Sequence, residues 1–422
     1  MTSRRRALLA AAALTGLAPT RAFSIASGAR PRVVVVGGGW GGASAARALA
    51  RAGGLEVVLV EPARQFDSTP LSNLVVAGLC APAALVRSYA RLAREVELVH
   101  EAAVAIDAER AELRLASGRR LGYDRLVLSP GVDFDWDAVD GARAAHASGA
   151  VLHAWRGGAE AARLREQIDA LRPGGVFAIA IPEAPLRCPP APYERACLVA
   201  ERLQRRNPRA KLIVFDANPE PASEAAQFLE VFRTRYAGMV DYRAAHRVVG
   251  VGADGAAQRL RFEVDDDQRV DLVNLLPPMR AGTLALHAGL ANRDGRWVGV
   301  RWRDFAATAA ERIHVIGDAI QNENAMAKSG AMALAQGEVA GAAIAAELLG
   351  HGAGAPGELA SACYSFTAHD AALTLQTRHR YVDAAQGWQP DMAARVVSAA
   401  PEAARAREAW GWAARSWAAL LG

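Results

Sequence analysis

A glycine-rich turn between two short β-branched runs constrains this chain more than any other feature. Residues 33–36 are four valines, the composition of a strand buried on both faces, and G-x-G-x-x-G follows through Gly37, Gly39 and Gly42. The three glycines permit a tight turn, close approach of the backbone to a pyrophosphate, and packing of helix on strand. A helix-forming stretch and a second apolar run come next, and that run ends in Glu61, where a carboxylate would bind a ribose. The pattern predicts a dinucleotide site with the phosphates at a helix N-terminus.

The composition is that of a folded globular protein, and its positive charge is concentrated at one end. Hydrophobic residues make up 52% of the 422 positions and charged residues 22%, enough for two or three domains. The formal net charge of +5 includes four arginines within residues 1–26, which contain no acid, and falls to +1 without them. A nearly neutral remainder gives no reason to expect a nucleic-acid partner.

Residues 1–26 have the pattern of a twin-arginine export signal. Arg4, Arg5 and Arg6 precede an apolar stretch over residues 7–18, which is shorter than the roughly 20 residues that a membrane-spanning helix needs. We therefore predict export by the twin-arginine route, a periplasmic location and no transmembrane segment in the mature chain. The alternative is an N-terminus that is basic without being a signal.

Two later segments indicate which dinucleotide to expect. Residues 123–131, which end in Gly131, and residues 308–319, which contain Gly317 and Asp318, resemble the second and third signature segments of flavoproteins with two dinucleotide domains. That resemblance implies FAD, with Asp318 bonded to the ribitol and the following helix directing its N-terminus at the flavin. A buried strand with an N-capping aspartate would also explain either segment alone.

The predicted fold class is α/β, with two Rossmann-like dinucleotide-binding-type domains plus a small C-terminal α+β domain. Residues 30–150 and 282–350 would form a discontinuous FAD-binding domain, and residues 151–281 the second Rossmann-like domain. Residues 358–422 would form a C-terminal interface domain. Its last helix carries apolar side chains at helical spacing, which favours a core or a subunit interface over attachment to a membrane surface.

A proline-rich loop takes the place of a second phosphate-binding turn. The apolar run 176–181 leads into residues 182–193, where several prolines fix φ and remove the N–H donors that would cradle a pyrophosphate. NAD(P)H is therefore not the expected electron donor. The loop presents Cys188 instead.

Around this cysteine the sequence resembles the flavoprotein subunit of flavocytochrome c sulfide dehydrogenase, within the wider sulfide:quinone reductase group. The resemblance covers nearly the whole mature chain and is most specific at residues 188–196 and 328–330. It also includes residues 36–43, which contain Trp40, and residues 71–74, 129–131, 277–278, 314–319 and 363–365. It implies a disulfide beside the flavin, attack of sulfide on that disulfide, a persulfide, and a thiolate that reduces FAD. A c-type cytochrome subunit would then accept the electrons singly.

Two positions depart from that family. Ile320 stands where the resemblance places the second redox cysteine, and Thr69 stands where the family attaches its flavin covalently. We therefore expect noncovalent FAD and no disulfide at the family's usual place. Another cysteine could pair with Cys188 only if the fold brings the two Cα atoms to about 4.4–6.8 Å. The candidates are Cys80, Cys197 and Cys363, of which Cys197 fits a small core residue best.

Three side chains are candidate catalytic groups. Cys188 could act alone as a nucleophile or carry a persulfide, and Glu194 could be a base or a first-turn carboxylate of the next helix. Lys328, one of two lysines in the chain, could stabilise the reduced flavin at its N1–O2 edge or be a surface cation. The predicted catalytic residues are Cys188, Glu194 and Lys328. The predicted cofactor-binding residues are Gly37, Gly39, Trp40, Gly42, Glu61, Gly131, Gly317, Asp318 and Lys328; no metal site is predicted.

The sequence therefore predicts an exported FAD-dependent oxidoreductase that oxidises sulfide or a related sulfur compound. Electrons would pass to a c-type cytochrome subunit. One alternative is a sulfide:quinone reductase-like enzyme. The other is a flavin-binding partner protein that has lost sulfide chemistry because Ile320 replaces a redox cysteine.

Overall fold

The first parallel sheet is built around the valine run that precedes the glycine turn. The computed structural model describes residues 30–352, 354 and 356–422, so the predicted export signal lies outside the described part of the chain. The strand order is β20-β21-β9-β1-β2-β5, parallel except for β20. These strands are β1 (Arg32–Val36), β2 (Glu56–Val60), β5 (Glu97–Val99), β9 (Arg125–Leu128), β20 (Ala306–Ala307) and β21 (Ala310–Val315). β1 is an interior strand because its valines can be buried on both faces.

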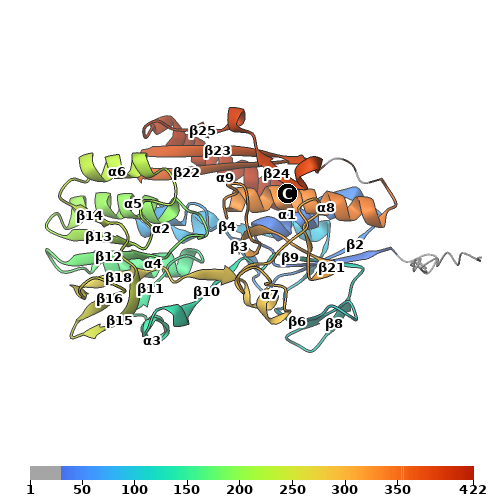
Figure 1. The fold of residues 1–422 in the computed structure, drawn as a ribbon, viewed down its shortest axis with the longest axis horizontal. Coiled ribbons are helices and arrows are strands. Elements are labelled where there is room, and N and C mark those ends of the chain that lie inside the picture. The colour runs from blue at the N-terminus through green and yellow to red at the C-terminus, as the bar shows by residue number, and fades with distance from the viewer. Residues whose placement is uncertain (1–29, 353, 355) are drawn as a thin grey trace, which may run out of the picture. The chain divides into compact units, whose positions relative to one another are not determined.

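A second parallel sheet has the order β11-β18-β12-β13-β14. Its strands are β11 (Val151–Leu152), β12 (Val176–Ile181), β13 (Lys211–Asp216), β14 (Val240–Arg243) and β18 (Leu272–Leu275), and its helices are α4 (Gly158–Asp169), α5 (Ala191–Arg206) and α6 (Ala225–Thr234). Figure 1 shows this sheet on the left and the first sheet on the right. Two helix-covered parallel sheets confirm the predicted fold class, while the exact domain limits stay a prediction.

Close helix packing positions the glycine turn. Helices α1 (Trp40–Ala52) and α8 (Gly330–Leu348) contact each other along their length. A Cβ on Gly337 would lie 2.4 Å from the backbone oxygen of Gly41, so only glycine permits this approach. The start of α8 is thereby held beside the start of α1.

Short elements complete the two halves. The remaining helices before residue 300 are α2 (Ser72–Val76), α3 (Ala142–Ala147) and α7 (Thr283–His287). The remaining strands before residue 300 are β3 (Gln65–Asp67), β4 (Val86–Ser88), β6 (Ala103–Asp107), β7 (Glu112–Leu115), β8 (Arg120–Gly122), β10 (Val132–Phe134), β15 (Val248–Asp254), β16 (Ala257–Phe262), β17 (Gln268–Val270) and β19 (Met279–Ala281). The larger hydrophobic core joins the first sheet to one face of the second, and a smaller core lies between the second sheet and β15–β17.

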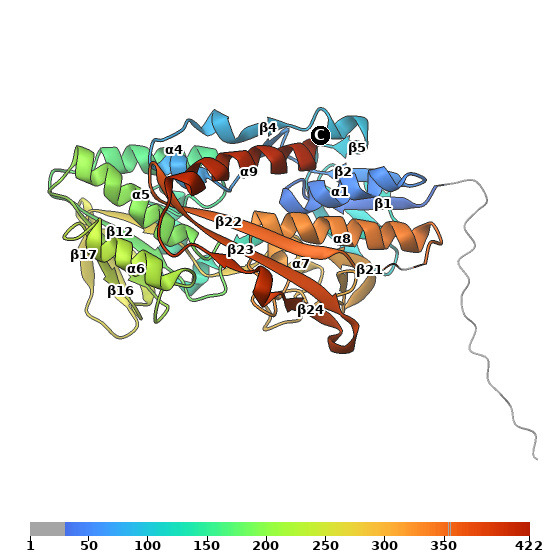
Figure 2. The ribbon, with the colours of Figure 1, turned by 90° about the horizontal axis from the view of Figure 1, so that it is seen from above.

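The C-terminal segment folds as antiparallel strands and one helix. Its elements are β22 (Glu358–Ala368), β23 (Ala371–Val382), β24 (Gly387–Pro390), β25 (Val396–Val397) and α9 (Ala403–Leu421). Strand β22 contacts both α5 and α8, so it reaches both halves of the molecule (Figure 2). In α9, Ala413, Trp417 and Leu421 are buried, whereas Trp410 is 37% exposed. None of the helices in the described residues is long and apolar enough to cross a membrane.

Candidate active site

The glycine turn has the geometry that its sequence predicts. Gly37 has φ +93°, and a Cβ there would lie 2.3 Å from the backbone oxygen of Ser129. A Cβ on Gly42 would lie 1.7 Å from the backbone oxygen of Gly37, so helix and turn touch at this point. Gly39 precedes α1 with open space in front of it and no side chain capping the helix. The first N–H groups of α1 are therefore free for an anion.

Glu61 directly follows β2 and bonds to the turn itself. Its carboxylate accepts hydrogen bonds from the N–H of Gly38 at 2.7 Å and the N–H of Ala63 at 2.8 Å. It is not among the residues that line the cavity described below. A role toward a ribose stays a prediction.

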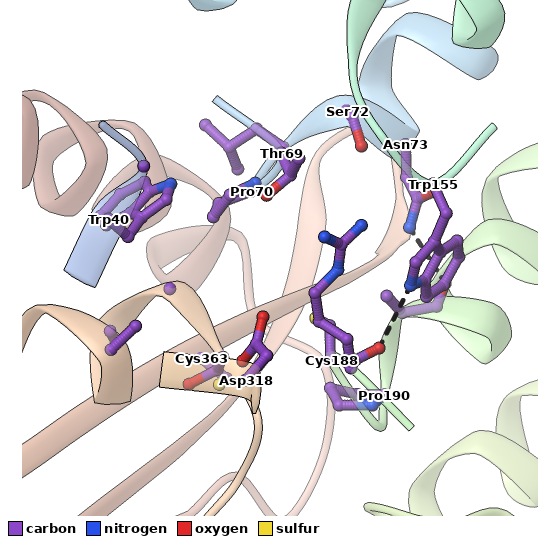
Figure 3. A pocket seen from close by; sticks show the side chains of 18 of the residues that line it. Trp40, Thr69, Pro70, Ser72, Asn73, Trp155, Cys188, Pro190, Asp318 and Cys363 are labelled. Carbon is purple, nitrogen blue, oxygen red and sulfur yellow. Dashed lines mark hydrogen bonds between the residues drawn. The ribbon is translucent and has the colours of Figure 1, made fainter. Parts of the chain in front are cut away.

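One cavity collects most of the predicted site residues and opens between the two halves of the fold (Figure 3). The predicted residues that line it are Gly39, Trp40, Gly131, Cys188, Glu194, Gly317 and Asp318. Thr69 lines it as well. Gly37 and Gly42 lie behind the lining, consistent with roles in the turn and in helix packing.

Asp318 presents an unsatisfied buried acceptor to this cavity. It lies in the short 3-10 turn η4 (Gly317–Ala319), held by a 2.7 Å bond from the Gly317 N–H to Gln336. Burial raises the pKa of the Asp318 carboxyl, opposed by the charges of Arg187 and Lys328, and its Oδ1 is buried without a hydrogen-bond partner. A buried acceptor without a donor is costly, so a hydroxyl-bearing ligand fits here. With the free N–H groups of α1, the cavity is suited to FAD.

Cys188 lies in a strained, anchored loop. Its φ is +55°, an uncommon value for a residue with a Cβ, and its N–H donates to the backbone oxygen of Lys328 at 2.7 Å. The preceding residue, Arg187, accepts a 3.3 Å hydrogen bond from the indole of Trp155, drawn dashed in Figure 3. Burial raises the pKa of the Cys188 thiol, and the neighbouring Arg187 charge acts in the opposite direction.

Cys363 is the cysteine that the fold brings to Cys188. It lies on β22 and lines the same cavity, and Figure 3 shows both beside Asp318. Together with burial, the Cys363 thiol raises the pKa of Cys188, and all four cysteines are free thiols. By contrast, Cys197 is fully buried within α5, and neither it nor Cys80 lines the cavity.

Opposing influences act on the Cys363 thiol, and those that keep it protonated are the larger. Burial, with Glu224, raises the pKa of its thiol to about 12, while hydrogen bonds to the hydroxyls of Ser329 and Ser361 act to lower it. Ser329 caps α8 and accepts from the N–H of Met332 at 3.2 Å. The thiol therefore lies beside the N-terminus of a long helix.

Glu194 is both a first-turn residue of α5 and a cavity residue. Its carboxylate accepts hydrogen bonds from the side chain of Asn73 at 2.6 Å and from the N–H of Phe366 at 2.9 Å. Burial is the largest influence and raises its pKa from 4.5 to about 7. A carboxyl with this pKa can exchange protons near neutral pH.

Lys328 is buried behind the 3-10 turn rather than exposed. Only 3% of the residue is accessible, which excludes a surface cation. Its ammonium donates to the backbone oxygens of Asp318 and Ile320 and lies 3.7 Å above the ring of Trp297. Burial lowers its pKa to about 7. Because Lys328 does not line the cavity, contact with a flavin edge stays a prediction.

Sequence reasoning missed two tryptophans and an arginine of the lining. Trp412 of α9 stacks on Trp40 with ring centroids 5.4 Å apart and planes 5° apart. Trp155 and Arg187 line the wall around Cys188. The proline loop pointed to Arg187 by position, but no local signal marks either tryptophan as part of the cavity.

Comparisons with known proteins agree with this architecture. Residues 31–157 match the family model of pyridine nucleotide-disulphide oxidoreductases, and residues 161–277 match that of the central part of the sulfide dehydrogenase (flavocytochrome c) flavoprotein chain. The chain is 24% identical to the mitochondrial sulfide:quinone oxidoreductases of Dictyostelium discoideum over 296 residues and of Mus musculus over 305. Each alignment covers 68% of this chain but only 65% of the relative.

A solved structure supports the same fold. The sulfide:quinone oxidoreductase of the hyperthermophilic bacterium Aquifex aeolicus superposes with a TM-score of 0.75 at 17% identity, over 92% of this chain and 91% of that chain. The two parallel sheets are typical of FAD- and NAD-binding oxidoreductases. In this fold the glycine turn and Asp318 face one cavity, which supports FAD as the dinucleotide of the first sheet.

Proposed function

We propose that the chain is an exported FAD-dependent oxidoreductase that oxidises sulfide, or a related small sulfur compound, and passes electrons to a c-type cytochrome subunit. One observation carries the proposal: Cys188 and Cys363 reach the cavity that also contains the glycine turn and Asp318. Two cysteines beside a dinucleotide pocket can cycle between dithiol and disulfide. The match of the central segment to a sulfide dehydrogenase chain supports the substrate class.

The proposed chemistry is a disulfide exchange. In the oxidised state Cys188 and Cys363 share a disulfide; the sulfur of hydrosulfide bonds to Sγ of Cys188, the disulfide breaks, and Cys363 leaves as a thiolate. Cys188 then carries a persulfide, whose outer sulfur has lost two electrons, and the former disulfide has gained them. FAD, when bound, supplies the acceptor for that electron pair.

Glu194 holds the proton in this scheme. It lines the cavity with both cysteines, and its pKa of about 7 allows it to take the proton of an approaching thiol and release it afterwards. The two hydrogen bonds that fix its carboxylate keep it oriented without protonating it.

The residues that would hold FAD are Gly39 with the first turn of α1, Gly131 and Asp318. Noncovalent binding is part of the proposal, because Thr69 lines the cavity and a hydroxyl side chain cannot form a thioether with the flavin. Export and the periplasmic location rest on residues 1–26 alone.

A quinone is the second candidate for the electron acceptor. It is favoured by the names of the similar proteins, which are sulfide:quinone oxidoreductases. The alternative that the protein has lost sulfide chemistry is less well supported than the sequence suggested. Ile320 replaces a redox cysteine, but Cys363 brings a second thiol to the cavity.

An anaerobic titration tests the proposal. The purified protein is expected to be yellow, and stoichiometric sulfide should bleach its flavin absorbance; Cys188→Ser and Cys363→Ser should abolish bleaching, and Cys80→Ser, away from the cavity, should not. Reduction of cytochrome c compared with a soluble quinone identifies the acceptor. A protein that cannot be reconstituted with FAD, that NADH reduces readily, or that sulfide still bleaches after Cys188→Ser would contradict the proposal.

A further inference from the structure

The charged side chains around the cavity differ in how fully they are satisfied. Those that line it are Asp67, Glu194, Asp318, Arg187 and Arg195. Arg195 is 1% exposed and donates to Asn73, to Asn274 and to two backbone oxygens, while its guanidinium stacks over the Trp155 ring at 4.7 Å. Four of its five N–H donors are used by protein groups, so Arg195 stabilises the fold and offers little to a ligand.

Arg187 has the opposite arrangement. Its backbone is fixed on both sides, by its N–H bonded to the sulfur of Met279 at 3.2 Å and by the indole of Trp155 on its oxygen at 3.3 Å. Within residues 30–352, 354 and 356–422, its guanidinium makes no hydrogen bond or ion pair. The residue is half-buried and lines the cavity. The side chain therefore holds its donors available in the cavity.

The position of Arg187 next to Cys188 indicates what those donors bind. Glu194 and Asp318 line the same cavity and, when ionised, repel an incoming anion, whereas the guanidinium attracts it. Both Asp318 and Cys188 interact electrostatically with Arg187, which places the cation among the reacting groups. A planar guanidinium also stays charged at every relevant pH.

We propose that Arg187 forms an anion subsite that receives the sulfur nucleophile as a small monoanion, hydrosulfide or an organic thiolate, beside Cys188. The inference deepens the proposed function and rests on it, because Cys188 is taken as the sulfur under attack. The same charge stabilises the thiolate forms of Cys188 that follow. Neutral nucleophiles of similar size gain nothing from the subsite.

A pair of alkylating reagents tests the subsite without turnover. Iodoacetate is an anion and iodoacetamide is neutral, but both react with the same thiolate. The rate of alkylation of Cys188 by iodoacetate divided by the rate with iodoacetamide is therefore independent of the thiol pKa. This ratio reports the preference of the site for an anion. The ratio is measured on the reduced full-length protein by peptide mass spectrometry. We expect Arg187→Gln to lower this ratio by about tenfold. Arg187→Lys should retain most of the ratio. Arg209→Gln, which changes an exposed arginine elsewhere, should leave the ratio unchanged.

An unchanged ratio in Arg187→Gln would overturn the inference, as would an equal loss in Arg209→Gln. If Arg187→Gln does not fold, thiocyanate added to the wild-type protein gives the same information: it should slow iodoacetate more than iodoacetamide, and equal slowing overturns the subsite. Failure of sulfide to bleach the flavin, together with a ratio that depends on Arg187, would reject the proposed function and leave the anion subsite standing.

Discussion

The buried carboxyl of Glu194 should make the stability of the protein depend on pH in a way that one substitution removes. The side chain is 7% exposed, and burial raises its pKa from 4.5 in the unfolded chain to about 7 in the folded protein. Between these two values the folded protein binds more protons at this position than the unfolded chain. The free energy of unfolding therefore falls as pH rises from 4.5 to about 7, and stays low above it.

The magnitude follows from the size of the pKa shift. A rise from 4.5 to about 7 corresponds to about 3 kcal/mol, at roughly 1.36 kcal/mol per pKa unit. Glu194→Gln has no proton to exchange and removes this penalty. The glutamine also loses one acceptor, since its NH₂ group cannot accept from Asn73, but that cost is the same at every pH.

The assay is guanidinium denaturation of the holoprotein at several pH values between 5 and 8, for wild type, Glu194→Gln and the exposed control Glu109→Gln. The free energy of unfolding of Glu194→Gln minus that of wild type should rise by about 3 kcal/mol across this range. The Glu109→Gln difference should stay flat. A flat difference for Glu194→Gln would refute the reasoning and show that its carboxyl titrates normally.

Three further predictions concern the cofactor pocket. Gly42→Ala places a methyl group 1.7 Å from the backbone oxygen of the turn, so the variant should purify without FAD, as the ratio of flavin to protein absorbance will show. Asp318→Asn removes a buried charge with an unsatisfied oxygen, so the apoprotein should gain about 1 kcal/mol in denaturant titrations while FAD affinity falls about tenfold in fluorescence titrations. Trp412→Ala loses the stack on Trp40 and should cost about 2 kcal/mol, whereas exposed Trp410→Ala on the same helix should cost less than about 0.5 kcal/mol, both read from denaturation midpoints.

Local steric demands explain why the first half of the site could be predicted. The turn requires a positive φ at Gly37 and a close contact with Gly42. Both requirements involve only a few adjacent residues, so the spacing of the glycines in the sequence predicts them. The presence of two parallel sheets follows from the alternation of apolar runs and helices. Lys328 shows the limit: its position before α8 was predicted, but the packing of Trp297 and the turn against its ammonium was not.

The second cysteine shows why the remainder required the fold. Cys363 is 175 positions from Cys188, and they share a cavity only because β22 contacts both α5 and α8. The family resemblance instead placed the partner directly after the 3-10 turn, where Ile320 is completely buried. A redox pair requires two sulfurs within bonding reach, whatever chain segments bring them there. The proposed reactivity of Cys188 therefore depends on the docking of the C-terminal sheet.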